Sequence, residues 1–290
     1  MKGPGCTQSL QSGRFPEGAL HIMNRKKAGT YKELQFSKRN LGKGCVLVVL
    51  SAVILQTGAA LDAVRTRDVH LLDLYLLNRA GDTFIQNIVA WYLPILIGIL
   101  TAGHFSYYRP VSDKIFTRMN PYKFLMERMK KGALVSAGYT LLFYLTCFVS
   151  LLVFDAFTGM RIVPGVSIAY DVQAPYFYYV HPLLYLFWYI LMAVLWAVVF
   201  SLAGMLSSLY IRRAGFIRFI PFVFMVVGVV LCAILPGAEL FSYYNAILLN
   251  QAGGFASART TMIAITLTPL ALGLVLMKWI RVRAGKDILS

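Results

Sequence analysis

Long apolar runs separated by short polar or basic segments dominate this chain. Six of these runs hold about 20 residues with almost no charge, enough for a helix to cross a hydrocarbon core of roughly 30 Å. They lack the strict alternation expected of barrel strands, and helices satisfy their own backbone hydrogen bonds in lipid. The pattern predicts an all-α integral membrane protein of about six transmembrane helices, at residues 44–63, 83–104, 133–154, 182–206, 216–236 and 260–280.

The fifth predicted span differs from the others because Arg218 and Pro221 lie near its start. Proline removes a backbone donor and clashes with the preceding turn of a helix. A broken or re-entrant helix is therefore an alternative to a simple crossing at this position.

Composition agrees with a polytopic membrane protein. The 290 residues are 58% hydrophobic and only 14% charged, whereas an ordinary soluble domain is about 25% charged. The net charge is +16, but the basic residues are spread over segments tied to the predicted spans. With no nucleic-acid-binding motif beside them, they favour membrane lipids over nucleic acid as the partner.

The distribution of basic residues predicts how the chain is oriented. With six spans, the N-terminus, the second and fourth connecting segments and the C-terminus share one side of the membrane. Of the 28 Lys and Arg residues, all but five lie on that side. Basic residues concentrate in the cytoplasm, so both termini are expected there. The five on the other side are Arg65, Arg67, Arg79, Arg161 and Arg259.

The predicted organisation has four parts. Residues 1–22 contain Gly, Pro and Ser but no apolar run, so they are expected to be disordered or an over-extended gene start rather than a signal peptide. Residues 23–43 form a basic, amphipathic cytoplasmic lead-in, with a solvated linker as the alternative. Residues 44–281 form the six-helix domain, and 282–290 form a cytoplasmic tail.

The predicted spans carry no Lys, Arg, Asp, Glu or His away from their ends. Ionisable groups inside a membrane mark proton relays, ion sites and embedded catalysis. Their absence argues against an ion-coupled carrier and against a membrane enzyme, and the four cysteines show no CxxC spacing typical of a metal site. No GxxxxGK[ST] sequence is present, so the chain has no Walker loop for ATP and is expected to hold no cofactor.

Mild polar residues inside the spans usually join helices by hydrogen bonds, and less often they line a path for an amphipathic substrate. Asn87 and Thr140 are the candidates for such a translocation path. Other polar residues of this kind are Gln86, Tyr139, Tyr144, Thr146, Tyr185, Tyr189, Thr266 and Thr268.

The segment 105–132, FSYYRPVSDKIFTRMNPYKFLMERMKKG, is about 28 residues long, although helices in bundles are commonly joined by two to eight. Asn120 and Pro121 predict a helix start, with Asn as cap and Pro in the first turn. Apolar residues then recur at helical spacing among basic ones. The segment is either a helix on the membrane surface or a docking element for a soluble partner.

Three stretches resemble the six-span permeases of type 2 ATP-binding-cassette (ABC) exporters. They are YLPILIGILTAGHFSYYR at 92–109, RMNPYKFLMERMKKG at 118–132 and HPLLYLFWYILMAVLWAVVFSLAGMLSS at 181–208. The similarity covers about residues 30–285.

The resemblance implies a transport subunit without catalytic residues in a bacterial plasma membrane. It implies a second permease copy, in a homo- or heterodimer, and a separate cytoplasmic ATPase that binds the ATP. The loop 105–132 is similar to the family's coupling helix, and 237–254 is similar to its exterior re-entrant region. The expected ATPase-docking residues are Phe105, Tyr107, Tyr108, Arg109, Ile115, Phe116 and Arg118.

Two other classes of function stay open on sequence alone. One is a membrane scaffold or immunity-type protein that recruits soluble partners without transport. The other is an ATP-independent carrier or lipid scramblase. The substrate of a transporter is not identified by any charged residue, although aromatic and Thr side chains suit amphipathic cargo.

Overall fold

The computed structural model describes residues 41–58, 92–100, 121–158, 182–211, 214–235 and 258–289. The chain divides into two compact units, Met1–Lys43 and Gly44–Ser290, and the packing described below belongs to the second. Within the described residues there are six helices and no strand. The predicted all-α fold class is confirmed.

Five of the described helices are long and apolar enough to cross a bilayer, the architecture of a multi-pass membrane protein. The sixth, at 92–100, falls within the second predicted span. The fifth predicted span is one continuous helix with Pro221 inside it, rather than a broken one. The five long helices are Leu41–Gly58, α5 (Pro121–Thr158), α7 (Pro182–Tyr210), α8 (Ala214–Ile234) and α10 (Ala258–Leu289).

α5 begins at Pro121, where the sequence predicts a helix start. Proline fits this position because the first backbone N–H of a helix has no intrahelical partner in any case. The helix then continues without interruption for 38 residues, or about 57 Å at 1.5 Å per residue. It therefore includes the last 12 residues of the segment 105–132 and runs directly into the third predicted span.

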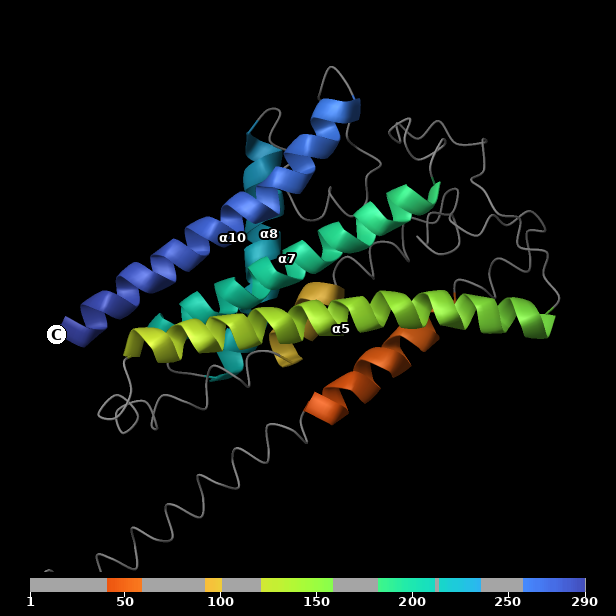
Figure 1. The fold of residues 1–290 in the computed structure, drawn as a ribbon, viewed down its shortest axis with the longest axis horizontal. Coiled ribbons are helices and arrows are strands. Elements are labelled where there is room, and N and C mark those ends of the chain that lie inside the picture. Colours follow the sequence, from red (N-terminus) through yellow and green to blue (C-terminus); the bar gives the residue numbers. More distant parts are fainter. Residues whose placement is uncertain are drawn as a thin grey trace, which may run out of the picture. The chain divides into compact units, whose positions relative to one another are not determined.

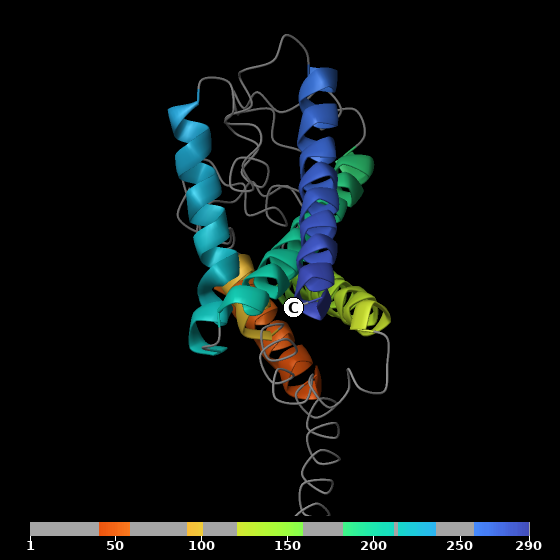
Figure 2. The same cartoon turned by 90° about the vertical axis from the view of Figure 1, so that its left-hand side faces the viewer.

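α7 is the central helix of the described part of the second unit. It packs against α5, α8 and α10 (Figure 1, Figure 2). In its apolar span 67% of the residues are buried, compared with 17% to 28% in the other four long helices. The outer helices consequently expose much of their apolar surface, as expected for residues that face lipid.

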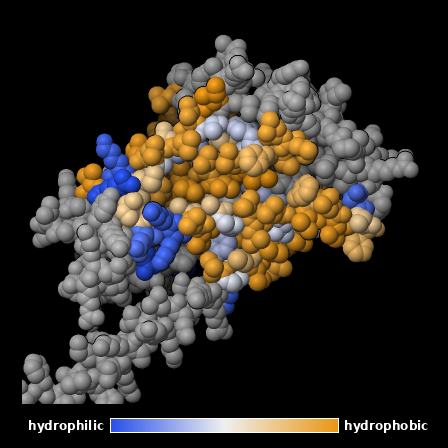
Figure 3. All heavy atoms as spheres, viewed as in Figure 1, coloured by the Kyte–Doolittle hydropathy of each residue, from blue (hydrophilic) through white to orange (hydrophobic). Residues whose placement is uncertain are grey.

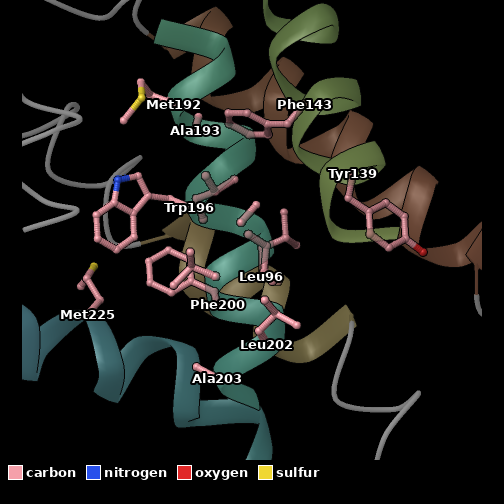
Figure 4. Packing of buried hydrophobic residues seen from close by; sticks show 14 of the residues in the cluster. Leu96, Tyr139, Phe143, Met192, Ala193, Trp196, Phe200, Leu202, Ala203 and Met225 are labelled. Carbon is pink, nitrogen blue, oxygen red and sulfur yellow. The ribbon is translucent and has the colours of Figure 1, made fainter. Parts of the chain in front are cut away.

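The interior at α7 is built from aromatic and small side chains. Trp196 and Phe200 point from α7 toward Met225 on α8 (Figure 4). The Phe200 ring meets the Phe224 ring edge-to-face, with centroids 6.4 Å apart. Ala203, on the next turn of α7, is also buried, and such small residues let neighbouring helices approach closely.

Contacts of the first helix establish its direction relative to two neighbours. Ser51 is hydrogen-bonded to Tyr92, while the region around Gly44 lies near Leu100, so Leu41–Gly58 and 92–100 run antiparallel. Cys147 on α5 lies 3.9 Å from the Ala52 carbonyl oxygen, and Tyr139 lies beside Gly44. Leu41–Gly58 and α5 therefore run parallel.

α7 and α10 also run parallel. Toward the start of both helices, the indole N–H of Trp188 donates to the Thr266 hydroxyl at 2.9 Å. Toward their C-terminal ends, the Arg283 guanidinium lies 5.2 Å from the centroid of the Tyr210 ring. A chain that crosses a membrane six times alternates its direction at each crossing. Its odd-numbered spans must therefore run parallel to one another, and so must its even-numbered spans, as these two helix pairs do.

The surface of the described residues agrees with this arrangement. Figure 3 shows a broad apolar band over the helices, with hydrophilic side chains near its margins. The described basic side chains of α5 are near its start and those of α10 are in its last third. They are Arg128, Lys130, Lys131, Lys278, Arg281 and Arg283.

Candidate functional site: a polar and aromatic interior

A chain of aromatic rings connects three helices in the interior. Tyr92, from the helix at 92–100, lies 6.4 Å from Phe143 on α5. Phe143 meets its neighbour Tyr144 edge-to-face at 5.5 Å, and Tyr144 meets Tyr189 on α7 in the same way at 5.7 Å. Edge-to-face pairs place the positive rim of one ring against the negative face of another, which favours these contacts beyond simple burial.

Helical spacing explains why these side chains converge. On α5, Tyr139, Phe143, Cys147 and Leu151 recur every four residues, and all four are buried. Residues four apart lie one above another on the same face of a helix. α5 thus presents one continuous inward face, even though its sequence is apolar on nearly every side.

Neutral hydrogen bonds join the helices around this interior. The Ser51 hydroxyl donates to the Leu47 carbonyl of its own helix at 2.6 Å, so the hydrogen bond between Ser51 and Tyr92 has Tyr92 as its donor. Trp188 and Thr266 supply the corresponding link between α7 and α10. Such bonds replace water that is absent in the membrane core.

The fully buried polar side chains among the described residues are uncharged. They are Gln56, Ser136, Thr140 and Ser201. Ser136 donates to the Gly132 carbonyl at 2.9 Å. The Ser201 hydroxyl on the central helix is buried and has no hydrogen-bond partner among the described residues.

The candidate path residue Thr140 is completely buried, and its hydroxyl donates to the Ser136 carbonyl of its own helix at 3.0 Å. This hydrogen bond stabilises α5, and the path role of Thr140 stays a prediction. Asn87 lies outside the described residues. So do the segment 237–254 and all the docking candidates, Phe105, Tyr107, Tyr108, Arg109, Ile115, Phe116 and Arg118.

Sequence reasoning named Tyr144, Tyr189 and Thr266 among the polar span residues, and the structure places all three at contacts between helices. It did not single out Gln56 or Ser201. Gln56 had a usable signal, since it is the single amide in the apolar first span and amides in lipid need partners. Ser201 had none, because serine is common in helix contacts of membrane proteins.

This interior offers ring faces, hydroxyls and one amide. Among the described residues, no group of three or more His, Cys, Asp or Glu could hold a metal ion. The groups present can stack on apolar or aromatic parts of a molecule and form hydrogen bonds to its polar parts.

Comparison with protein-family models, with curated proteins and with solved structures finds no match for this chain. The membrane-helical architecture rests on the length and composition of the helices themselves.

Proposed function

We propose that this chain is the membrane-spanning permease subunit of an ABC exporter. It moves an amphipathic substrate across the bacterial plasma membrane, and a separate cytoplasmic subunit hydrolyses the ATP. In this proposal both termini are cytoplasmic, and two permease copies form the translocation unit. The sequence resemblance supports the class of transporter, and the geometry of α5 supports its mechanism.

The observation that carries the proposal is the length and continuity of α5. A bilayer crossing needs about 20 residues, and α5 has 38. About 18 residues, or roughly 27 Å of helix, are in excess of one perpendicular crossing. The helix is unbroken from Pro121 into the membrane. If the docking segment that precedes Pro121 is displaced, α5 therefore moves as one rigid helix, and its membrane-spanning part moves with it.

Inside the membrane, α5 contacts the first span and the fourth span, among others. Tyr139 lies against Gly44, and Cys147 lies near the Ala52 carbonyl, both on the first helix. Tyr144 packs against Tyr189 on the central helix α7. Movement of α5 would therefore change the contacts of the first and fourth spans together, as two-state helix rearrangements require.

The chemistry of the interior supports ATP as the source of energy. Uphill transport needs two conformations whose populations a ligand shifts by binding them unequally. The buried polar side chains of the described spans are hydroxyls and an amide, which do not titrate near neutral pH. ATP bound to a docked subunit supplies the required difference in binding, and α5 transmits it.

The first test is co-purification. The full chain, tagged at its C-terminus and extracted from its native membrane, is expected to bring an ATPase with it. The double substitution Arg109→Glu and Phe116→Ala should remove that partner while the chain remains inserted. If the unsubstituted chain brings no nucleotide-binding protein, the exporter proposal is wrong, and the scaffold and ATP-independent carrier classes remain.

The second test concerns α5 as a rod. Lys130 and Lys131 are exposed, and replacing both by Gly costs about 1 kcal/mol of helix propensity per residue relative to Ala. The matched control replaces both by Ala, which removes the same charges but keeps the helix stiff. In inside-out vesicles, ATP-driven uptake of a fluorescent amphipathic dye should fall severalfold in the Gly variant only. Equal uptake by the Gly and Ala variants would show that α5 does not transmit the movement.

A further inference from the structure

α10 has two distinct faces along its length. The inward face carries Ile265, Leu276 and Ile280, all at most 6% exposed. The outward face carries Leu267, Leu270 and Leu274, which are 56%, 42% and 64% exposed. The same outward stripe then continues into two exposed basic residues, Lys278 and Arg281.

The stripe has the spacing of a single helix face. Its members, Leu267, Leu270, Leu274, Lys278 and Arg281, are three or four residues apart, so each lies one turn beyond the last. From Leu267 to Lys278 is 11 residues, or about 16 Å along the helix. That is close to half of a hydrocarbon core of roughly 30 Å, the depth of one leaflet.

The orientation of this end of α10 is fixed by a contact on its other side. Arg283 lies with its guanidinium 5.2 Å from the centroid of the Tyr210 ring on α7, a cation–π contact. Trp279 is 54% exposed, and exposed Trp is typical of the boundary between hydrocarbon and headgroups. Lys278 and Arg281 therefore face outward at headgroup level.

We propose that the outward face of α10 binds an anionic phospholipid. One acyl chain lies along Leu267, Leu270 and Leu274, and the headgroup phosphate sits between Lys278 and Arg281. No ion pair with a described residue is found for either cation, so their charge is available to a phosphate. Arg supplies a planar pair of donors and Lys a point charge, both suited to phosphate oxygens.

A lipid fits this face better than a second copy of the chain. Two copies meeting symmetrically through it would bring Lys278 and Arg281 of one close to the same residues of the other. Like charges at such an interface are repulsive, and the described part of the face offers no carboxylate to compensate. A phospholipid supplies both the apolar length and the negative charge.

The purified full chain in neutral detergent is the material for the test. Phosphatidylglycerol is expected to raise its melting temperature and to stay bound in native mass spectrometry, whereas phosphatidylcholine of the same acyl length is retained far less. Lys278→Gln with Arg281→Gln should weaken phosphatidylglycerol retention roughly 10- to 30-fold. The matched control, Lys130→Gln with Lys131→Gln on α5, removes the same charge and should leave retention unchanged.

Four results would overturn the proposal. One is equal retention of the two lipids, and another is an equal loss in the two double variants. The third is full stabilisation by inorganic phosphate alone, which would make the site an anion site without a lipid chain. Leu270→Ser with Leu274→Ser should also weaken retention, and if it instead dissociates a dimer while lipid stays bound, the face is a contact between copies. None of these results depends on whether an ATPase co-purifies.

Discussion

Gly98 provides the sharpest test of the helix packing. A methyl group added at this glycine would overlap the Arg218 carbonyl oxygen in the first turns of α8 and would lie 3.2 Å from the Pro221 side chain. The obstacle is mostly backbone, which cannot swing aside as a flexible side chain can. The helix at 92–100 and α8 therefore approach so closely at this point that only glycine fits.

The size of the effect follows from two opposing contributions. Forcing an extra methyl group into a packed interior costs about 1–3 kcal/mol. Replacing Gly by Ala in a helix gains about 0.5–1 kcal/mol from reduced backbone freedom. Because the obstacle is backbone, the upper end of the packing cost applies. Gly98→Ala should therefore destabilise the chain by about 2–2.5 kcal/mol, which corresponds to a melting temperature roughly 4–10 °C lower.

The matched control is Gly228→Ala on α8. No heavy atom lies within 4 Å of a Cβ built at Gly228, so only the gain in helix propensity applies, about 0.5–1 kcal/mol. Both variants are melted as full chains in the same detergent, followed by tryptophan fluorescence. Trp196 reports directly, because it lies on the α7 side of the contact with α8 (Figure 4).

The expected order of melting temperatures is Gly98→Ala lowest, the unsubstituted chain next and Gly228→Ala equal or highest. A Gly98→Ala protein that melts at or above the unsubstituted chain would refute the close approach of 92–100 to α8. A large loss in both variants would mean that glycine serves helix flexibility in this chain rather than close packing.

Two further predictions concern the first span and the direction of α5. Gly44→Ala should destabilise the chain by about 1–2 kcal/mol, because the new methyl group would meet the Tyr139 ring and hydroxyl. Adding Tyr139→Phe should recover part of this loss in a double-mutant cycle. Strictly additive losses would exclude the contact. The direction of α5 is tested in a chain whose native cysteines are replaced by Ala. A membrane-impermeant maleimide added to intact cells should label Phe157→Cys, at a position 86% exposed, and should not label Lys131→Cys. The reverse pattern would place both termini outside.

Much of the fold could be predicted from the sequence because apolar length is a direct physical requirement of the bilayer. The third predicted span, 133–154, lies inside α5, and 182–206 lies inside α7. The helix start at Pro121 was also predictable, since proline is favoured at that position. Pro221 was harder to interpret, because tertiary contacts decide whether a helix tolerates proline, and here α8 continues through it.

The candidate site was predictable only in its residue types. Tyr144, Tyr189 and Thr266 were recognisable as polar groups inside spans, but a sequence does not show which helix faces which. Nothing in the run around Ser201 indicates that its hydroxyl is buried without a described partner. Thr140 is a similar case, since nothing in the sequence indicates that its hydroxyl donates to the Ser136 carbonyl of its own helix.

The contacts of α5 and α7 are compatible with both a stable helix packing and a shift of one helix against the other. Both helices place buried aromatic residues at contacts between helices, where ring edges meet ring faces. Such contacts are shorter-ranged and less directional than charged hydrogen bonds, so a helix can shift by about one turn and find a new set of ring partners. A salt bridge buried in the same place would cost several kcal/mol to break and would hold a single arrangement. In the proposed exporter, a neutral aromatic interior around the long helix α5 is therefore an interior in which nucleotide binding on a docked subunit selects between two packings.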